Sequence, residues 1–355
     1  MHSDILSNRV ERSGSGRVVM HKAAAIGLLK DQLEHLSSDE DLDAAVLTVL
    51  ALARNELDQG SMRVGVVLQF EPHLPTASWM NVYGRVEPVE THARAMLLLV
   101  ERAGGLPNLK LPGLAATIAY ADLLDASATY RKPAFACWWE MDKTIVHAHS
   151  GLRSGAGNAP GRAFFTKGTR GLPGSAISVL VCLATVDRYM AARHNKALEK
   201  EEENLLVMSR NTIQHRLLSL PSFEDLSESE TEGTDPVGYE ICRLTAVIYS
   251  NAVILGLPPH TRWHEVLAKR LRALLESNQS SSVVVEVSDL LIWALCVGGL
   301  AAWRTPEREF FESALRNATR KRKLLTWVKV ERVVEDFLWS QSACKHGAAM
   351  IWLSL

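Results

Sequence analysis

The sequence predicts an all-α protein, built as a multi-helix bundle or array. Apolar residues recur at a spacing close to 3.6 in every long segment, whereas strand-like alternation is confined to short runs. An unbroken apolar run also extends from Leu290 to Trp303 and contains two adjacent glycines. It is shorter than the roughly 20 residues that a bilayer span requires, and it lacks the G-x-G-x-x-G spacing of a dinucleotide site. A helix that is apolar on every face belongs at the centre of a helical packing, so this run predicts a core helix.

The composition indicates an intracellular protein with no general attraction to nucleic acid. The chain has 355 residues, a formal net charge of -1 and five cysteines. A charge this close to zero provides no long-range attraction to nucleic acid or to an anionic membrane. The odd number of cysteines and their wide spacing argue against a disulfide framework, which favours a reducing compartment. The N-terminus shows neither a signal peptide nor a transit peptide pattern.

The first half of the chain is expected to hold a flexible tail, a set of helices and one aperiodic insertion. The tail covers residues 1–20. Ser38 is placed to cap the second helix, and Gly104 and Gly105 are placed to end the third. Residues 61–90 carry β-like residues and prolines without sustained periodicity, which predicts an atypical insertion that a retained intron could have produced. The helices are expected at 22–36, 37–57, 89–106 and 113–130.

The second half begins with a predicted linker and continues as helices. Residues 150–175 are rich in glycine and contain no acid, which predicts a flexible, exposed segment that is dispensable for folding. Residues 222–236 are acidic and predict a solvated loop. An apolar stripe at helical spacing predicts a further helix near the C-terminus, with Trp327, Val330, Val334, Phe337 and Leu338 on its buried face.

Histidines and glycines provide two weak candidates for chemistry. His260 and His264 are four residues apart, but a zinc protease motif needs glutamate directly after the first histidine, and Thr261 stands there. The pattern favours two polar residues at a helix start, and His147–His149 favours a loop in the same way. The stretch 154–161 approaches a phosphate-binding loop, but Pro160 replaces its third glycine, which favours a linker.

Two charged groups are the remaining candidates. Asp122 and Asp125 lie three residues apart on one helix face, as a sparse version of a magnesium-binding pair would, although a solvated helix edge is the commoner meaning. The basic cluster of residues 320–323 is either a nuclear-import or phosphate-contact patch or the coating of a helix end. No catalytic, cofactor-binding or metal-ligating residue is predicted from these patterns, and no cofactor is expected.

Five segments occur in an order and spacing that resembles the fungal-specific transcription factor regulatory domain, over residues 21–355. They read HARAMLLLVERAGGL, ADLLDASATYRKPAF, YEICRLTAVIYSNAV, SDLLIWALCVGGLAAWRTPEREFF and TWVKVERVVEDFLWSQSAC. In that family the helical region follows a Zn2Cys6 cluster that reads DNA. Such a cluster needs six closely spaced cysteines, and this sequence shows only Cys137, Cys182, Cys242, Cys296 and Cys344, each far from the others.

The resemblance implies a regulatory, protein-interacting domain of a transcription factor without its own DNA-binding cluster. It implies a nuclear location, protein partners or self-association, a possible small effector and no sequence-specific DNA contact by this chain; a cytoplasmic location is the alternative. Two other functions stay open. One is an all-α magnesium-dependent enzyme of isoprenoid-cyclase type that uses Asp122 and Asp125, and the other is a helical scaffold.

Overall fold

The computed structural model describes most of the chain. The described residues are 20–21, 23–31, 33–34, 39–54, 68–74, 90–140, 144–145, 161–165, 171–193, 196 and 198–355. They contain helices and turns and no strand, which confirms the all-α prediction for this part of the chain. Two compact units are present, and each is described by itself. The first comprises residues 1–59 and 86–119, and the second comprises residues 60–85 and 120–355.

The first unit is a small helical assembly. A helical stretch that begins at residue 20 precedes α2 (Asp39–Arg54) in the chain. Helix α2 packs against α4 (Glu90–Arg102). The short 3-10 helix η2 (Leu106–Asn108) and the first turn and a half of α5 (Leu114–Thr129) complete the unit. Asp43 of α2 accepts hydrogen bonds of 2.6 Å from the backbone N–H groups of Lys110 and Leu111, which fixes the connection after η2.

The glycine pair predicted to end α4 does so. Gly104 and Gly105 have φ values of 81° and 103°, which place both in the region that favours glycine. The N–H of Gly105 donates to the carbonyl of Val100 at 2.9 Å, so a carbonyl of the last turn is satisfied.

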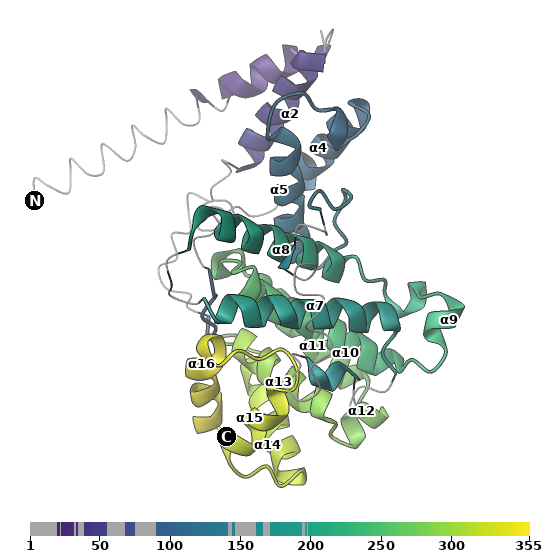
Figure 1. Ribbon diagram of the computed structural model, residues 1–355, viewed down its shortest axis with the longest axis vertical. Coiled ribbons are helices and arrows are strands. Elements are labelled where there is room, and N and C mark those ends of the chain that lie inside the picture. The colour runs from purple at the N-terminus through teal and green to yellow at the C-terminus, as the bar shows by residue number, and fades with distance from the viewer. Residues whose placement is uncertain are drawn as a thin grey trace, which may run out of the picture. The chain divides into compact units, whose positions relative to one another are not determined.

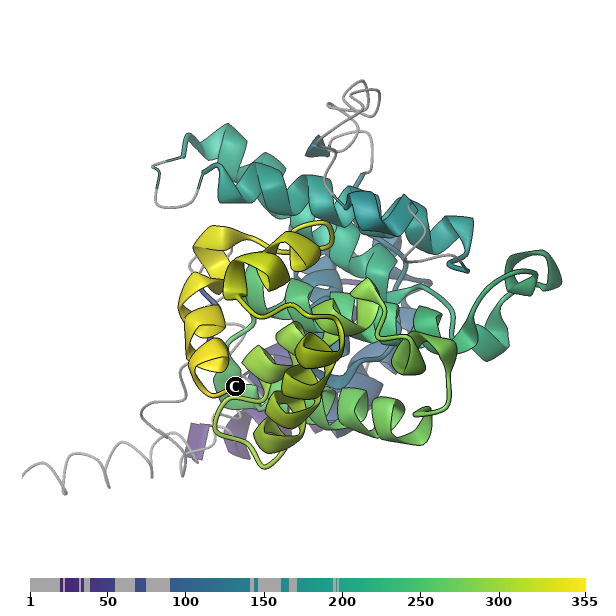
Figure 2. The ribbon, with the colours of Figure 1, turned by 90° about the horizontal axis from the view of Figure 1, so that it is seen from below.

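The second unit is built around one apolar helix, α13 (Asp289–Ala301). Helix α13 packs against α10, α11, α14, α15 and α16, and Figure 2 shows the C-terminal helices, coloured yellow-green to yellow, lying together. Helices α7 and α8 form an antiparallel pair on another side of the unit (Figure 1). The long helices are α7 (Gly174–Ala191), α8 (Lys200–Leu218), α10 (Pro236–Tyr249), α11 (Trp263–Ser277), α13, α14 (Arg308–Lys321), α15 (Trp327–Val334) and α16 (Gln341–Leu353).

Shorter turns join these helices. They are the 3-10 helices η5 (Arg162–Phe165), η7 (Phe223–Asp225) and η9 (Pro259–Thr261), the one-turn helices α9 (Glu228–Thr231) and α12 (Ser282–Val285), and a π-helical continuation of α10 (Ser250–Ile254).

Helix α13 confirms the core position predicted for the apolar run. Every residue from Leu290 to Ala301 is buried. The hydroxyl of Ser288 caps the helix by accepting from the N–H of Leu291 at 3.2 Å. A Cβ added at Gly298 would overlap the ring of Phe311, and one added at Gly299 would overlap Ile351. The two glycines therefore allow α14 and α16 to approach closely, which compensates for their low helix propensity.

A buried polar network ties α8 to its neighbours in the second unit. The amide nitrogen of Gln214 donates to Ser127 Oγ and to Asn251 Oδ1, both at 2.9 Å. Asn251, in the π-helical turn, donates in turn to the carbonyl of Ser127 at 2.9 Å. Because every member finds a partner, the network fixes the mutual register of the helices without leaving an unpaired polar group.

Two segments expected to lie outside the core contribute to it. Within the predicted insertion, residues 68–74 bring Phe70 into the core, and the N–H of Glu71 donates to the carbonyl of Ala343 at 2.8 Å. Within the predicted linker, Ala163 and Phe164 are buried, and the ring of Phe164 meets that of Trp293 edge-on at 5.9 Å. The expectation of an exposed linker is thus wrong for Gly161, Ala163 and Phe164, whereas Arg162 is exposed. The hydrophobic residues beside the glycines hold that turn in place.

Other expectations have mixed outcomes. The acidic segment 222–236 contains η7 and α9 in place of an open loop, and Leu226 in it is buried. The C-terminal apolar stripe is buried as predicted at Val330, Val334, Phe337 and Leu338, although α15 ends at Val334. The N-terminal tail and the Ser38 cap lie outside the described residues, except that Met20 opens a helical stretch.

Among the described helices, α7 alone is long and apolar enough to cross a membrane. More than half of its residues are buried within the second unit, and it carries Asp187 in a buried hydrogen-bonded pair. These are the properties of a core helix of a folded domain.

Candidate functional site

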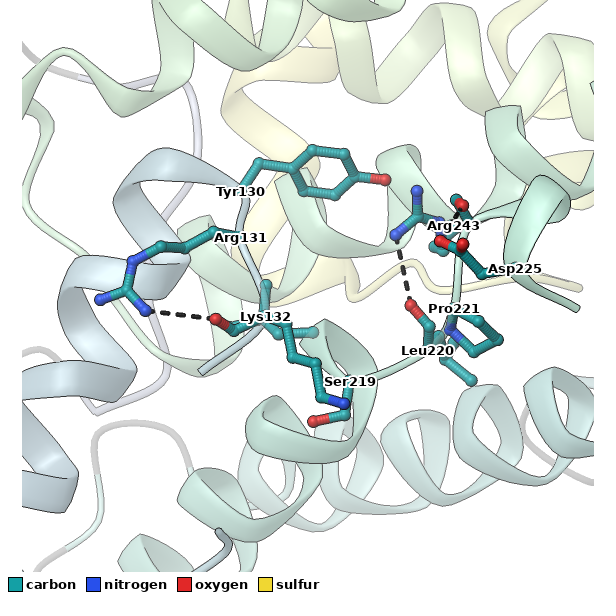
Figure 3. Close-up of a pocket in the computed structure, with 10 residues that line it drawn as sticks. Tyr130, Arg131, Lys132, Ser219, Leu220, Pro221, Asp225 and Arg243 are labelled. Carbon is teal, nitrogen blue, oxygen red and sulfur yellow. Dashed lines mark hydrogen bonds between the residues drawn. The ribbon is translucent and has the colours of Figure 1, made fainter. Parts of the chain in front are cut away.

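A cavity of about 490 Å³ lies in the second unit, between the end of α5, the end of α8 and the middle of α10 (Figure 3). This volume falls within the range usual for small-molecule sites. The lining combines apolar surface with basic and hydroxyl side chains. Its residues are Tyr130, Arg131, Lys132, Leu218, Ser219, Leu220, Pro221, Ser222, Asp225 and Arg243.

The end of α5 positions Tyr130. Tyr130 follows the last helical residue and has φ 56°, in the left-handed region. The N–H of Arg131 donates to the carbonyl of Ala126 at 3.1 Å, the backbone bond that closes a Schellman-type helix end. Glycine is the usual residue there, and a tyrosine costs roughly 1 kcal/mol or more. The helix end therefore holds an aromatic side chain in a strained backbone position beside the cavity.

Two guanidinium groups lie close to the Tyr130 ring. The Cζ atom of Arg243 lies 5.0 Å from the ring centroid and that of Arg270 lies 5.6 Å from it. The Tyr130 side chain extends toward Arg243 in Figure 3. Its hydroxyl is buried and has no hydrogen-bond partner among the described residues. Burial raises the pKa of Tyr130 well above its ordinary value of 10.0, with Arg243 opposing the shift, so the phenol stays protonated and remains a donor.

Glu240 and the chain after α8 hold Arg243 in place. Its Nη2 donates to Glu240 Oε2 at 2.8 Å and its Nε donates to the same oxygen at 3.2 Å. Its Nη1 donates to the carbonyl of Leu220 over 3.4 Å, which is long for a hydrogen bond. The second oxygen of Glu240 accepts from the N–H of Phe223 at 2.8 Å, and the Tyr239 hydroxyl donates to the carbonyl of Pro221 at 2.6 Å. The wall formed by the α8–α10 connection is thus fixed by hydrogen bonds from α10.

The two carboxylates considered as magnesium ligands, Asp122 and Asp125, are both largely buried. Asp122 is buried, and its Oδ2 accepts from the N–H groups of Ala134 at 2.7 Å and Phe135 at 3.1 Å. Its Oδ1 accepts from Arg131 at 2.7 Å. The expected solvated helix edge is therefore wrong for Asp122, because this carboxylate anchors the segment that follows α5. Asp125, one turn later, is also largely buried.

The histidine candidates do not come together as a metal site in the described residues. His264 is the second residue of α11 and is buried against Trp263, whose ring it meets edge-on at 5.7 Å. Burial lowers the pKa of His264 to about 4. His260 lies in η9, but its side chain is outside what the structure describes, as are His147–His149. No group of three or more His, Cys, Asp and Glu side chains gathers in the described part of the chain.

The glycine-rich and basic candidates also have structural explanations where they are described. Residues 154–160 lie outside the described residues, and Gly161 packs against Phe164 at the start of η5. In the basic cluster, Lys321 donates to the carbonyl of Val285, and Arg322 pairs with Asp289 at 2.7 Å. Part of the cluster thus secures the connection before α13.

The sequence offered only a faint signal for the cavity. Tyr130, Arg131 and Lys132 precede Pro133, so a helix end was visible, but the ten lining residues come from three separated stretches. No spacing rule links the end of α5 to Arg243, more than a hundred residues later. Only the packing of α5, α8 and α10 brings the basic residues and the tyrosine together.

Comparison with known families gives one finding. The pattern described as the fungal specific transcription factor domain matches residues 6–352, which is nearly the whole chain and includes both units. Comparison with curated proteins and with solved structures gave no significant match. The match agrees with the five segments that resemble this family and with the all-helical architecture. The chain belongs to the fungal-specific transcription factor domain family.

Proposed function

We propose that this chain is a regulatory region that controls transcription through contacts with other proteins, while sequence-specific DNA contact is made by another element or by a partner. The observation that carries the proposal is the family match across residues 6–352. The proposal places the protein's action in the nucleus, with the cytoplasm as the alternative.

The cysteines support the part of the proposal that concerns DNA. A Zn2Cys6 cluster holds its metal through closely spaced thiolates. Here Cys182, Cys242, Cys296 and Cys344 are buried thiols, and Cys137 is a half-buried thiol. Burial raises the pKa of Cys296 to about 12, which keeps that thiol protonated. The buried cysteines serve as small apolar core residues. We therefore assign sequence-specific DNA contact to another element or to a partner.

Charge supports the same assignment. Binding to DNA without sequence preference depends on cations that neutralise phosphates, and the net charge of the chain is -1. The basic cluster of residues 320–323 is short, and Arg322 in it already pairs with Asp289 at 2.7 Å. We infer that the cluster secures α14 to α13 more than it contacts nucleic acid.

The proposal describes a non-enzymatic protein. The rival, a magnesium-dependent isoprenoid cyclase, needs carboxylates that are free to coordinate the metal. Both oxygens of Asp122 are instead bound by Arg131 and by backbone N–H groups. A helical scaffold without a regulatory role is the second rival, and it differs from the proposal only in its effect on transcription.

A binding selection tests the DNA part of the proposal. The purified chain is titrated against a random duplex library at about 0.15 M salt, near physiological ionic strength. We expect no enriched motif, whereas enrichment of one motif without added protein would show direct readout. In a parallel assay, the purified chain is given magnesium and a prenyl diphosphate. We expect no turnover of the diphosphate, and turnover would establish the enzymatic rival.

A further inference from the structure

Most of the unused hydrogen-bonding capacity in the cavity lies on the donor side. The Tyr130 hydroxyl has no partner among the described residues. Lys132 is exposed at the cavity and forms no ion pair with the described residues. The Nη1 atom of Arg243 has only its long bond to the carbonyl of Leu220. On the acceptor side, Oδ2 of Asp225 accepts from the hydroxyl of Ser222 at 2.5 Å, and its Oδ1 accepts no hydrogen bond from the described residues. A ligand that suits this lining presents acceptors.

The apolar part of the lining sets the second requirement. Leu218, Leu220, Pro221 and the Tyr130 ring contribute hydrocarbon surface, and the cavity is large enough for a small organic molecule. An inorganic anion would satisfy the donors but leave this surface in contact with water. A ligand with an apolar body and an acidic group satisfies both parts.

The backbone of Tyr130 points to a binding role. A left-handed tyrosine is uncommon, and such strain is concentrated at sites where it holds a functional side chain in place. Here the strained position places the ring near the guanidinium groups of Arg243 and Arg270. The helix end itself needs only a residue at this φ, which glycine would provide at lower cost. The packing of the ring against these cations holds the Tyr130 hydroxyl, which is buried and has no partner among the described residues, in the wall of the cavity.

We propose that this cavity binds a small organic carboxylate, with the acidic group held by the donors of Lys132, Tyr130 and Arg243 and the apolar body placed against Leu218, Leu220 and Pro221. Binding would brace the end of α5 against the α8–α10 connection, and the regulator would use it as an effector site. That regulatory use rests on the function proposed above. The binding of the carboxylate is independent of the proposed function, because it is measured on the purified chain alone.

Calorimetric titration of the full chain with benzoate tests the proposal. Benzamide, its neutral isostere, and inorganic phosphate, an anion without an apolar body, are titrated beside it. We expect benzoate to bind with one site, and benzamide to bind at least about tenfold more weakly because the charge-assisted hydrogen bonds are lost. Phosphate that binds as well as benzoate, or equal binding of benzamide, overturns the proposed ligand class. Absence of benzoate binding to the folded chain overturns the site.

Variants locate the binding. Tyr130→Phe removes only the hydroxyl, and Lys132→Met removes only the charge; each is expected to weaken benzoate binding about tenfold or more. Lys329→Met, which changes an exposed lysine of α15, is the matched control and is expected to leave the affinity unchanged. Circular dichroism confirms that each variant is folded. If the Tyr130 and Lys132 variants bind as the wild type does, the cavity is not the site. A failure of transcriptional control with benzoate binding intact would reject only the regulatory use.

Discussion

The Nε2 atom of His73 lies 2.9 Å from Oδ1 of Asp187, and both side chains are buried in the second unit. The hydroxyl of Tyr249 donates to the same carboxylate at 3.0 Å and 3.1 Å. His73 belongs to the predicted insertion and Asp187 to α7, so the pair connects the inserted segment to a core helix. The N–H of His73 also donates to the carbonyl of Val253 at 3.1 Å.

Replacing His73 is expected to destabilise the second unit. His73→Ala leaves the buried Asp187 carboxylate without its imidazole partner, which lowers the free energy of unfolding by about 3 kcal/mol. Urea denaturation followed by circular dichroism measures the change. His346→Ala, at an exposed position of α16, is the control and should change stability by less than about 0.5 kcal/mol. A similar, small effect of both substitutions would show that residues 68–74 are not needed by the core.

We propose that residues 61–90 are a genuine insertion and not a retained intron. A stretch translated from intron sequence has no reason to supply a core phenylalanine and a histidine that pairs with a buried aspartate. Sequencing of the transcript decides between the two. The spliced message should still encode residues 64–79, and a mature message without them would restore the intron explanation.

The glycines of α13 are expected to tolerate no side chain. Gly298→Ala introduces a Cβ into the ring of Phe311 and should lower stability by about 1–2 kcal/mol, although alanine favours the helix. Gly174→Ala, at the start of α7, is the matched control, since no atom lies within 4 Å of its added Cβ. That variant should be neutral or slightly more stable. Equal stability of the two variants in urea would contradict the close packing of α14 on α13.

Stability should fall as the pH falls through the range in which His264 titrates. Burial lowers the pKa of His264 from 6.5 to about 4, so the unfolded chain binds this proton more readily than the folded one. The contribution of His264 to the free energy of unfolding is fully present above pH 6.5 and is lost as the pH falls toward 4. About 2 kcal/mol of it is lost between pH 7 and pH 5.

The variant His264→Leu isolates this contribution. Its urea midpoint should depend less on pH between 7 and 5 than that of the wild type, because it cannot take up the proton. Parallel pH profiles of the two proteins would show that His264 titrates normally in the folded state.

Asp122 is expected to act as an anchor and not as a metal ligand. Asp122→Asn replaces a charged acceptor of three hydrogen bonds and should lower stability by about 2 kcal/mol. Asp336→Asn, in an exposed pair with Arg162, should have a much smaller effect because water screens that pair. Magnesium should not change the urea midpoint of the wild type. A magnesium-dependent stabilisation that Asp122→Asn abolishes would support the enzymatic rival.

The helical plan could be predicted from the sequence because it depends on local patterns. The period of apolar residues predicted the helices, Gly104 and Gly105 predicted the end of α4, and the apolar run of α13 predicted a core helix. These features follow from residues that are close in the chain. The roles of Asp122 and Phe164 could not be predicted in the same way, because each depends on partners brought near only by folding.

The cavity illustrates the same difference. Tyr130 directly follows α5 and Arg243 lies in α10, and their approach depends on how both helices pack on α8. A pattern of acid and base can predict a site when the chemistry fixes a spacing, as in a zinc cluster. An anion-binding cavity fixes no spacing, so its residues become visible only in three dimensions.

Tethering the chain to a reporter gene tests the central claim most directly. The chain is fused to a heterologous DNA-binding module, and reporter transcription is compared with that of the module alone at equal abundance; the same chain without the module serves as the control. We predict a several-fold change in transcription that requires the module, since a regulatory region acts through protein contacts wherever it is placed. Unchanged transcription with the folded, tethered chain would contradict the account and leave the helical scaffold as the better description.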